Sequence, residues 1–574
     1  MATATIPVET EQMDEAVEIE GLDLNSMSDA LKKACEDSPH LLEYVGSLPS
    51  SVGMPEFALE LTRKMGETKQ PNIIYATHKN GVFIHVLFDP DDVRNHYIPI
   101  EPTSTMDVAE LMAKVETGLL DLKQRLPAID LDGDREKQLL ECLFMVTNGD
   151  GQGNQGIVAR SKAFLSNRTQ PRIDLTPREA EAIKYLFIRD KLGLGVMDPL
   201  IIDPYIEDIS CSGMGNVFVE HKIFKALKST ITFSSFEELD KFVLWLSERV
   251  RKPVNYRKPI ADATLPDGSR INIVYGKDIS KRGSNFSIRK FNEVPLSIFE
   301  IADFGTLNYQ MLAYLSLAIG NGMNVFVSGE TASGKTTLLN AVTTFIPPLA
   351  KVLTIEDTAE LQVPHKNWIR EVVQSTKVES GGAVTMFDLL KAALRQRPNE
   401  IMVGEIRGAE GNIAFQAMQT GHSVMATFHA ASVEKLIQRL TGDPILVPKN
   451  YVDNLNIVIL TSQVKLPNGR TGRRVTSIAE IVSYDASLQA FSFIEAFKWN
   501  QEKDIFEFTG YMTSYVLEYK IAPKLGIPNH KRQQIYAELD RRTAILAKLH
   551  KERKVTGFYE VLEVLTRAQK EGLF

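Results

Sequence analysis

A glycine-containing segment near the middle of the chain has the residue types and spacing of a phosphate-binding loop. Residues 329–336 match GxxxxGK followed by Ser or Thr, between a strand-like apolar run (325–328) and a helix-like run (337–342). Glycines let backbone N–H groups approach phosphates, and a helix N-terminus adds positive potential. The pattern predicts that Lys335 contacts the β- and γ-phosphates and that the Thr336 hydroxyl binds Mg²⁺. The predicted nucleotide-binding residues are Gly329, Glu330, Thr331, Ala332, Ser333, Gly334, Lys335, Thr336 and Thr337.

Two apolar runs downstream end in carboxylates. Residues 401–405 end in Glu405, and residues 352–357 end in Glu356 and Asp357. A carboxylate at the edge that faces the loop is expected to bind the metal or to orient water, which is the role we assign to Glu405. A general base must lie within hydrogen-bond reach of the attacking water, and we assign Glu356 to it. Asp357 is either a metal-shell or structural acid or a helix N-cap. The predicted metal ligands are Thr336, Glu405 and Asp357.

Two histidines seven residues apart, His422 and His429, flank the apolar run 424–426. A zinc site needs three or four ligands, and no cysteine or third histidine lies nearby in the sequence. We therefore interpret the pair as hydrogen-bonding sensors of the phosphate state. Satisfied structural histidines are the alternative.

The elements around these residues predict an α/β fold. From residue 321 to about 480, short apolar strands alternate with helices, the pattern of a mostly parallel sheet. A second set of strands and helices precedes it, and Ser297 and Glu300 have capping-box spacing at the junction. The predicted organisation is an acidic disordered tail (1–25), an accessory α/β region (26–147), a Gly/Asn-rich linker (148–170), an α/β domain (171–296) and the loop-containing domain with C-terminal helices (297–574).

Composition excludes several classes of protein. The 574 residues are 44% hydrophobic and 24% charged, as in a globular domain rather than a disordered or fibrous chain. No apolar run approaches the roughly 18 residues of a membrane span, and residues 1–23 lack the pattern of a secretory signal. A net charge of −8 argues against nucleic acid as a partner. The dispersed Cys35, Cys142 and Cys211 indicate neither a zinc pair nor a disulfide framework, which fits a reducing cytoplasm.

The motifs, taken in order, resemble those of one family, the secretion ATPases of type II and type IV secretion, type IV pili and archaeal surface filaments. The family's loop GxTxSGKTT matches residues 329–337, and its aspartate box, Walker B strand and histidine box resemble residues 355–360, 401–407 and 420–430. Residues 356–368 resemble the EDTxEL and PHxNW segments of the archaeal branch, the motors of the archaellum and of archaeal pili. The sequence lacks the CxxC insertion of the bacterial pilus branch.

The resemblance extends upstream to the family's N-terminal domain, which resembles residues 265–270 and 286–291. In that domain arginines reach the nucleotide, and Arg270 and Arg289 match their positions. The resemblance implies that these two guanidinium groups stabilise charge on the transferring phosphoryl group, as an arginine finger does. A structural salt bridge is the alternative.

The resemblance also implies an architecture and a function. It implies a RecA-like P-loop motor domain, a smaller α/β N-terminal domain and an N-terminal extension, assembled as a hexameric ring. ATP with Mg²⁺ would be hydrolysed at subunit boundaries, on the cytoplasmic face of the membrane, against a polytopic platform protein and with a cytoplasmic regulatory ATPase as a further partner. We expect an ATP-hydrolysing motor for assembly or rotation of an archaeal filament. Macromolecule export and a non-motor ATP-binding adaptor stay open as alternatives.

Overall fold

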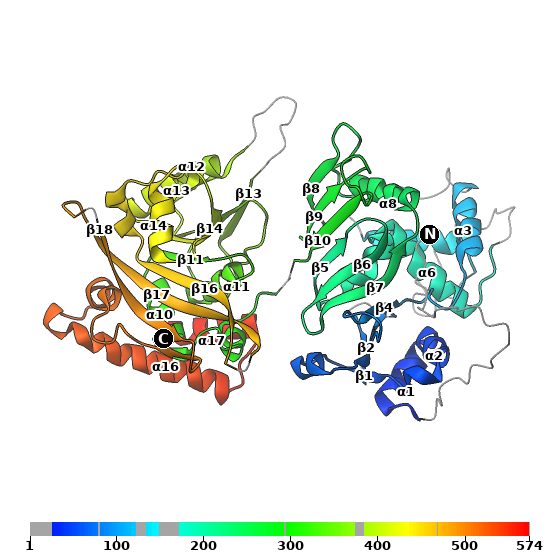
Figure 1. Cartoon of the computed structure of the whole chain (residues 1–574), viewed down its shortest axis with the longest axis horizontal. Coiled ribbons are helices and arrows are strands. Elements are labelled where there is room, and N and C mark those ends of the chain that lie inside the picture. Colours follow the sequence, from blue (N-terminus) through cyan, green and yellow to red (C-terminus); the bar gives the residue numbers. More distant parts are fainter. Residues whose placement is uncertain are drawn as a thin grey trace. The chain divides into compact units, whose positions relative to one another are not determined.

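The computed structural model describes residues 26–77, 81–121, 134–148, 172–291, 294–373, 384–467, 469–488, 490–572 and 574. The chain divides into two compact units, Met1–Phe291 (unit 1) and Asn292–Phe574 (unit 2) (Figure 1). The predicted acidic tail (1–25) and residues 149–170 of the predicted linker lie outside the described residues.

Unit 1 is built on one ten-stranded sheet in the order β1-β2-β3-β4-β7-β6-β5-β10-β9-β8. Parallel pairing of β4 with β7 joins strands from the predicted regions 26–147 and 171–296, so these two regions share a single sheet. β1 and β2 are also parallel, and the remaining neighbouring strands of this sheet pair antiparallel. The strands are β1 (Glu56–Ala58), β2 (Asn72–Ala76), β3 (Phe83–Leu87), β4 (His96–Ile100), β5 (Ile206–Cys211), β6 (Gly215–His221), β7 (Lys225–Phe233), β8 (Ile260–Thr264), β9 (Arg270–Val274) and β10 (Asn285–Arg289).

The helices of unit 1 begin where the sequence supplies capping groups. The Ser235 side chain accepts from Glu238 N at the start of α8, while the Glu238 carboxylate accepts from Ser234 N. Leu239, Val243 and Leu246 of α8 then pack into the core of the sheet. The helices are α1 (Asp29–Asp37), α2 (Pro39–Gly46), α3 (Ala109–Asp121), α4 (Arg135–Val146), α6 (Pro177–Lys191), α7 (Asp198–Ile202) and α8 (Phe236–Arg249), with 3₁₀ segments at Ser50–Val52, Arg63–Glu67 and Gly195–Met197.

Unit 2 contains a nine-stranded sheet in the order β13-β12-β14-β15-β11-β16-β17-β18-β19. The strands from β13 to β16 are parallel, so their carboxyl ends meet at one edge, and β16 to β19 form an antiparallel meander. The predicted α/β fold with a mostly parallel sheet is confirmed. The strands are β11 (Val325–Gly329), β12 (Val352–Glu356), β13 (Trp368–Val372), β14 (Glu400–Ile406), β15 (Ser423–Phe428), β16 (Ile457–Lys465), β17 (Thr471–Asp485), β18 (Ala490–Asn500) and β19 (Ile505–Glu507).

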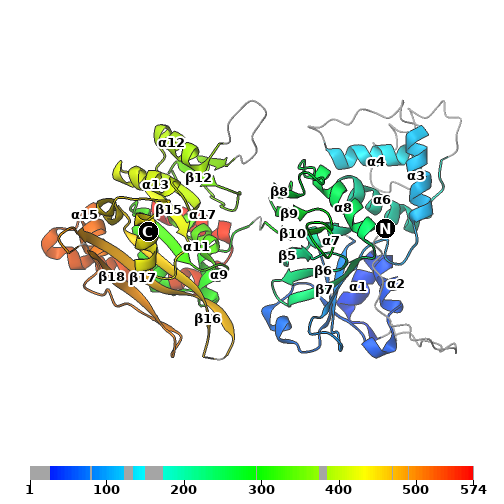
Figure 2. The same ribbon diagram turned by 45° about the horizontal axis from the view of Figure 1, so that its top comes forward.

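Helices cover both faces of the parallel part of this sheet (Figures 1 and 2). Because successive strand residues point to opposite faces, Val325 and Val327 belong to one core and Phe326 to the other. Burial on both faces is the reason that these strands read as continuous apolar runs. The helices are α9 (Ile298–Asp303), α10 (Tyr309–Gly320), α11 (Lys335–Val342), α12 (Met386–Gln396), α13 (Glu410–Gln419), α14 (Val433–Thr441), α15 (Ala522–Lys524), α16 (Ile535–Lys551) and α17 (Phe558–Lys570), with 3₁₀ or π segments at Thr343–Phe345, Lys449–Asn454, Val516–Ile521 and Asn529–Gln534.

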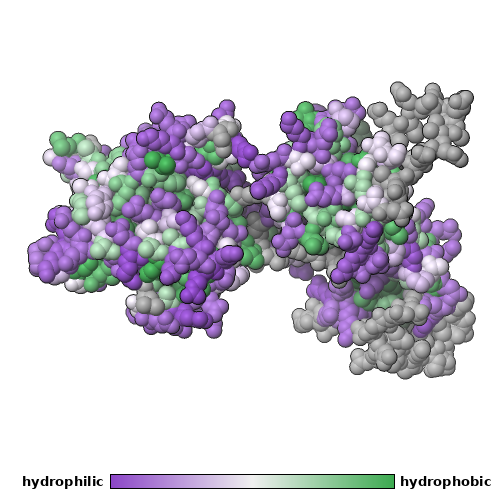
Figure 3. All heavy atoms as spheres, turned by 90° about the horizontal axis from the view of Figure 1, so that it is seen from below, coloured by the Kyte–Doolittle hydropathy of each residue, from purple (hydrophilic) through white to green (hydrophobic). Residues whose placement is uncertain are grey.

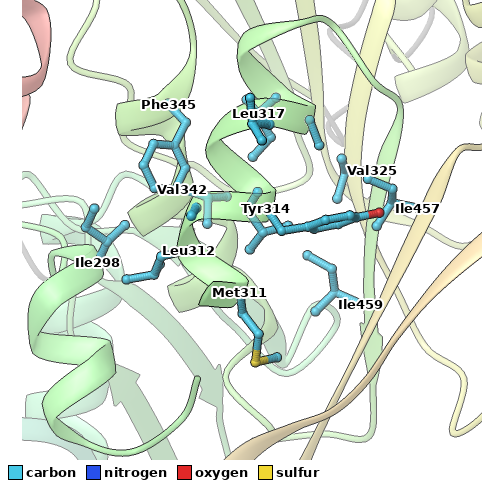
Figure 4. Packing of buried hydrophobic residues seen from close by; sticks show 14 of the residues in the cluster. Ile298, Met311, Leu312, Tyr314, Leu317, Val325, Val342, Phe345, Ile457 and Ile459 are labelled. Atoms are coloured by element: carbon cyan, nitrogen blue, oxygen red, sulfur yellow. The ribbon is translucent and has the colours of Figure 1, made fainter. Parts of the chain in front are cut away.

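The first core is centred on α10, a helix whose residues 311–319 are all buried. Figure 4 shows Tyr314 and Leu317 of α10 beside Val325 of β11 and Ile457 of β16. The Tyr314 hydroxyl donates to Glu480 Oε1 at 2.7 Å, which gives the buried phenol a partner. This packing holds β11, and therefore the start of the predicted phosphate loop.

The junction between the units has the local structure that the sequence predicts. Ser297 accepts from Glu300 N and the Glu300 carboxylate accepts from Ser297 N, so the predicted capping box at the start of α9 is confirmed.

None of the helices in the described ranges has both the length and the apolar character needed to cross a bilayer. On the face seen in Figure 3, apolar residues are interspersed among polar ones.

Candidate active site

The glycine-rich loop connects the carboxyl end of β11 to the N-terminus of α11. Gly334 is the N-cap of α11 and takes φ +89°, a conformation in which glycine carries no steric penalty. A Cβ on Gly329 would collide with the Thr461 carbonyl oxygen, so only glycine fits. Lys335 Nζ donates to the carbonyls of Gly329 at 3.0 Å and Glu330 at 2.8 Å. The loop thus presents a buried ammonium group and the free N–H groups of a helix start at one place.

Residues from the antiparallel meander brace this loop. Ser333 Oγ donates to Glu330 O at 2.8 Å and lies 3.1 Å from Thr461 Oγ1 of β16. Arg473 Nε of β17 donates to the Ala332 carbonyl at 3.0 Å. Neither Thr461 nor Arg473 was identified from the sequence, because no local pattern links positions more than 120 residues apart.

Glu356 ends β12 at the same carboxyl edge of the sheet as the loop, with β14 and β15 between β12 and β11, and is 1% exposed. Its Oε1 accepts from Glu360 N and Leu361 N, both at 2.7 Å. Its Oε2 accepts no hydrogen bond from the described residues and lies 3.7 Å from Arg370 Nε. Burial raises the pKa of Glu356 to about 7 despite these partners. One carboxylate oxygen is therefore held in place while the other remains available to accept a proton.

Glu405 is placed by a bulge in β14. Val403 pairs with Ala426 and Ile406 with Phe428, so two residues of β14 lie opposite one residue of β15. Glu405 Oε2 lies 2.5 Å from Arg407 Nη2, and its Oε1 lies 3.2 Å from His429 Nε2. Burial alone would raise the pKa of Glu405, but the hydrogen bond and charge of Arg407 hold it below its ordinary value. Glu405 therefore stays ionised where Glu356 can take up a proton.

Lys335, Glu405 and Arg407 influence one another's pKa values. Burial lowers the pKa of Lys335, and the charge of Glu405 opposes that shift. The hydrogen bond to Glu405 raises the pKa of Arg407, and the charges of Asp357 and Glu360 add to it. Asp357 is exposed and directly follows β12. Arg407 is the last residue of the predicted Walker B segment, so its place in that motif could have identified it as a residue of the site.

The two predicted histidines do not converge within one chain. His429 follows the carboxyl end of β15 and contacts Glu405. His422 precedes the same strand, and its Nδ1 lies 3.1 Å from Thr420 Oγ1. Six residues of strand at about 3.3 Å each separate them by on the order of 20 Å. His429 thus lies beside Glu405 and His422 lies at the other end of the strand, and the role of the two histidines as sensors of the phosphate state stays a prediction.

Arg270 and Arg289 lie on unit 1 and form a directly opposed pair. Arg289 of β10 is in register with Arg270 of β9 on one side and with Asp208 of β5 on the other. The neighbours Ile271 and Ile288 point to the buried face, so both arginines lie on the opposite face. Burial raises the pKa of Asp208 and the charge of Arg289 opposes that shift, so one carboxylate already faces this pair.

The oxygen donors at the edge of unit 2 fit Mg²⁺ delivered with a nucleotide. Mg²⁺ typically takes one or two protein ligands and completes its shell with phosphate oxygens and water. Thr336 in the first turn of α11 and the ionised Glu405 are donors of this type. In the part of the chain that the structure describes, no three His, Cys, Asp or Glu side chains gather as a self-sufficient metal site.

The sequence is similar to proteins of type II and type IV secretion systems and to an uncharacterized protein over nearly its whole length. A family model described as Type II/IV secretion system protein matches residues 190–461. The uncharacterized protein MJ0900 of Methanocaldococcus jannaschii is 41% identical over 553 residues, which cover 95% of this chain and 98% of that protein. The type IV secretion system protein PtlH of Bordetella pertussis is 42% identical over 130 residues, 22% of this chain and 38% of that protein. Protein VirB11 of Agrobacterium fabrum is 28% identical over 256 residues, 40% of this chain and 74% of that protein.

Proposed function

The chain belongs to the type II/IV secretion system ATPase family, and we propose that it is an ATP-hydrolysing motor which powers assembly or rotation of an archaeal type IV pilus-like filament. The observation that carries the proposal is the shared sheet edge of the phosphate loop, the buried Glu356 and the ionised Glu405. These are the groups that hydrolysis of a phosphoanhydride requires.

The geometry supports a division of labour during hydrolysis. Lys335 would donate to the β- and γ-phosphate oxygens in place of the loop carbonyls. Glu356 Oε2 would accept the proton of a water molecule as its oxygen attacks the γ-phosphorus, while the bond from that phosphorus to the β–γ bridging oxygen breaks to leave ADP and phosphate. Mg²⁺ bound with the nucleotide would be held by Thr336 and Glu405, with Asp357 beside them, and would neutralise charge on the phosphates.

The archaeal filament assignment is supported by the sequence segments of residues 356–368, which resemble those of the archaeal branch. Export of a macromolecule is the second candidate, favoured by the 130 residues shared with PtlH, a type IV secretion system protein. A non-motor adaptor is disfavoured, because a protein that only binds ATP has no use for a proton acceptor such as Glu356.

The assembly that we propose is a hexameric ring docked peripherally on the cytoplasmic face of the membrane. It would act on a polytopic platform protein, with a cytoplasmic regulatory ATPase as a further partner. Arg270 and Arg289 would complete each site from the N-terminal domain of the same or a neighbouring subunit. Their opposed positions on β9 and β10 support an anion-binding role.

The test is ATP turnover by the full chain and by Lys335→Ala. The substitution removes the buried ammonium group, so both nucleotide binding and hydrolysis should be lost. Lys351→Ala is the matched control, because Lys351 Nζ donates to the Gln396 carbonyl and takes no part in the loop. Turnover near the wild-type value in Lys335→Ala would contradict the assignment of the loop.

A further inference from the structure

Arg473 of β17 contacts the phosphate loop at two residues. Its strand, β17, pairs with β16, and Arg473 is in register with Gln463. Arg473 Nε donates to the Ala332 carbonyl at 3.0 Å. Its aliphatic stem lies against Gly334, where an added Cβ would be 3.3 Å from Arg473 Cδ. The guanidinium group therefore meets the middle of the loop from the side of the antiparallel meander.

The contacted residue has a backbone conformation that needs support. Ala332 has φ +62°, a left-handed value that residues with a Cβ rarely adopt. Such a conformation persists when the surroundings hold it. The hydrogen bond from Arg473 is made to the carbonyl of this residue, so it holds the peptide that directly follows the strained torsion.

The same peptide also carries the N–H of Ser333, the residue that follows Ala332. In a trans peptide the carbonyl and the following N–H point in opposite directions. The Ala332 carbonyl accepts from Arg473, and on the other side of the same peptide Ser333 N donates to Glu330 O at 3.4 Å. Lys335 Nζ donates to that same Glu330 carbonyl at 2.8 Å. Arg473 thus fixes the orientation of a loop amide next to the lysine.

We propose that Arg473 is a positioning residue for the phosphate loop, which holds the loop amides in the orientation that binds nucleotide phosphates. The proposal rests on nucleotide binding at this loop as the proposed function. In this role Arg473 contacts Ala332 and Gly334 of the loop, and the chemistry of hydrolysis belongs to Lys335, Glu356 and Glu405.

The experiment compares the wild-type chain with Arg473→Met and with Lys465→Met. Methionine keeps an unbranched stem against Gly334 but removes the donor. Lys465 is an exposed cation on the same hairpin, in register with Thr471, so its substitution controls for loss of one positive charge. The readouts are the Kd of ADP with Mg²⁺ by calorimetry and the kcat and KM for ATP.

Arg473→Met should raise both the ADP Kd and the ATP KM about tenfold, at the low end for loss of a hydrogen bond from a charged donor. Its kcat at saturating ATP should stay within about threefold of wild type, because the groups that act on the γ-phosphate are untouched. Lys465→Met should change each constant less than about twofold. An ADP Kd that is unchanged in Arg473→Met, with or without a lower kcat, overturns the proposal.

Ala332→Gly separates positioning from a general loss of structure. Glycine adopts φ +62° without a penalty, so the loop of the Ala332→Gly variant should depend less on Arg473. Adding Arg473→Met to Ala332→Gly should then raise the ADP Kd by no more than about threefold. An equal effect in both backgrounds overturns the mechanism. Absence of ADP binding by the wild-type chain would instead contradict the proposed function itself.

Discussion

Two glutamates on neighbouring strands have environments that push their pKa values apart. Glu356 is enclosed, and burial raises its pKa to about 7. Glu405 is also partly buried, but Arg407 and His429 hold its pKa below the ordinary value. Carboxylates with different environments can divide acid–base and electrostatic roles between them. At the residue scale, Glu356 is thus suited to take a proton and Glu405 to remain charged beside a cation.

Glu356→Gln should remove hydrolysis and keep nucleotide binding. The amide oxygen can still accept from Glu360 N and Leu361 N, whereas the amide nitrogen cannot accept a proton from water. We expect kcat to fall about 10²- to 10⁴-fold, the usual range for general acid–base catalysis, with the ADP Kd within about threefold. Single-turnover ATP hydrolysis and calorimetry measure the two quantities.

The matched control is Glu371→Gln, the same change on β13, where the carboxylate accepts from Gln396. It should leave kcat within about threefold of wild type. Normal hydrolysis by Glu356→Gln together with an inactive Glu405→Gln would show that the base lies on the other strand.

At the scale of elements, the sequence predicts the strands well and their long-range relations poorly. The predicted runs 325–328, 352–357 and 401–405 each coincide with an observed strand to within a residue, because burial on both faces makes them continuously apolar. The predicted apolar run between His422 and His429 is the strand β15, which places the two histidines at its opposite ends. The bulge in β14 and the contact of Arg473 depend on strand registers, which no local pattern encodes.

Gly404 lies in the bulge of β14, and its lack of a side chain leaves room for Glu356. A Cβ on Gly404 would lie 3.1 Å from Glu356 Cγ, closer than ordinary packing distance. Gly404→Val should displace the Glu356 carboxylate from the two N–H groups that hold it and lower kcat at least about tenfold. The ADP Kd should stay within about threefold, since the loop is not altered. Gly404→Ala should have a smaller effect of the same kind.

Steady-state kinetics on the alanine and valine variants, with thermal melting to confirm that both fold, test this relation. A kcat that is unchanged in Gly404→Val, with the fold intact, would show that the position of Glu356 does not limit hydrolysis.

At the scale of the whole molecule, the groups proposed to act on one nucleotide are divided between the two units. Arg270 and Arg289 lie on unit 1, and Lys335, Glu356 and Glu405 lie on unit 2. The proposal that they act jointly on one γ-phosphate therefore includes closure of a unit 1 on a unit 2, from one chain or from two. Such closure is the step through which hydrolysis could produce force.

Mixing of inactive subunits distinguishes the two forms of closure. We expect a chain with Arg270→Ala and Arg289→Ala, and a chain with Lys335→Ala, each to be inactive alone. If the arginines act between subunits, mixed rings contain sites with an intact loop facing intact arginines, and part of the ATPase activity should return. Rings shown to be mixed that regain nothing would assign the arginines to their own chain.

The measurement that tests the central claim most directly is ATP turnover per subunit as a function of protein concentration, with assembly followed in parallel by mass photometry. A ring motor with the site described here should hydrolyse ATP, and turnover per subunit should rise as subunits assemble and level off once rings are complete. Glu356→Gln should assemble in the same way without turnover. Assembled wild-type protein that binds ATP and does not hydrolyse it would contradict the account.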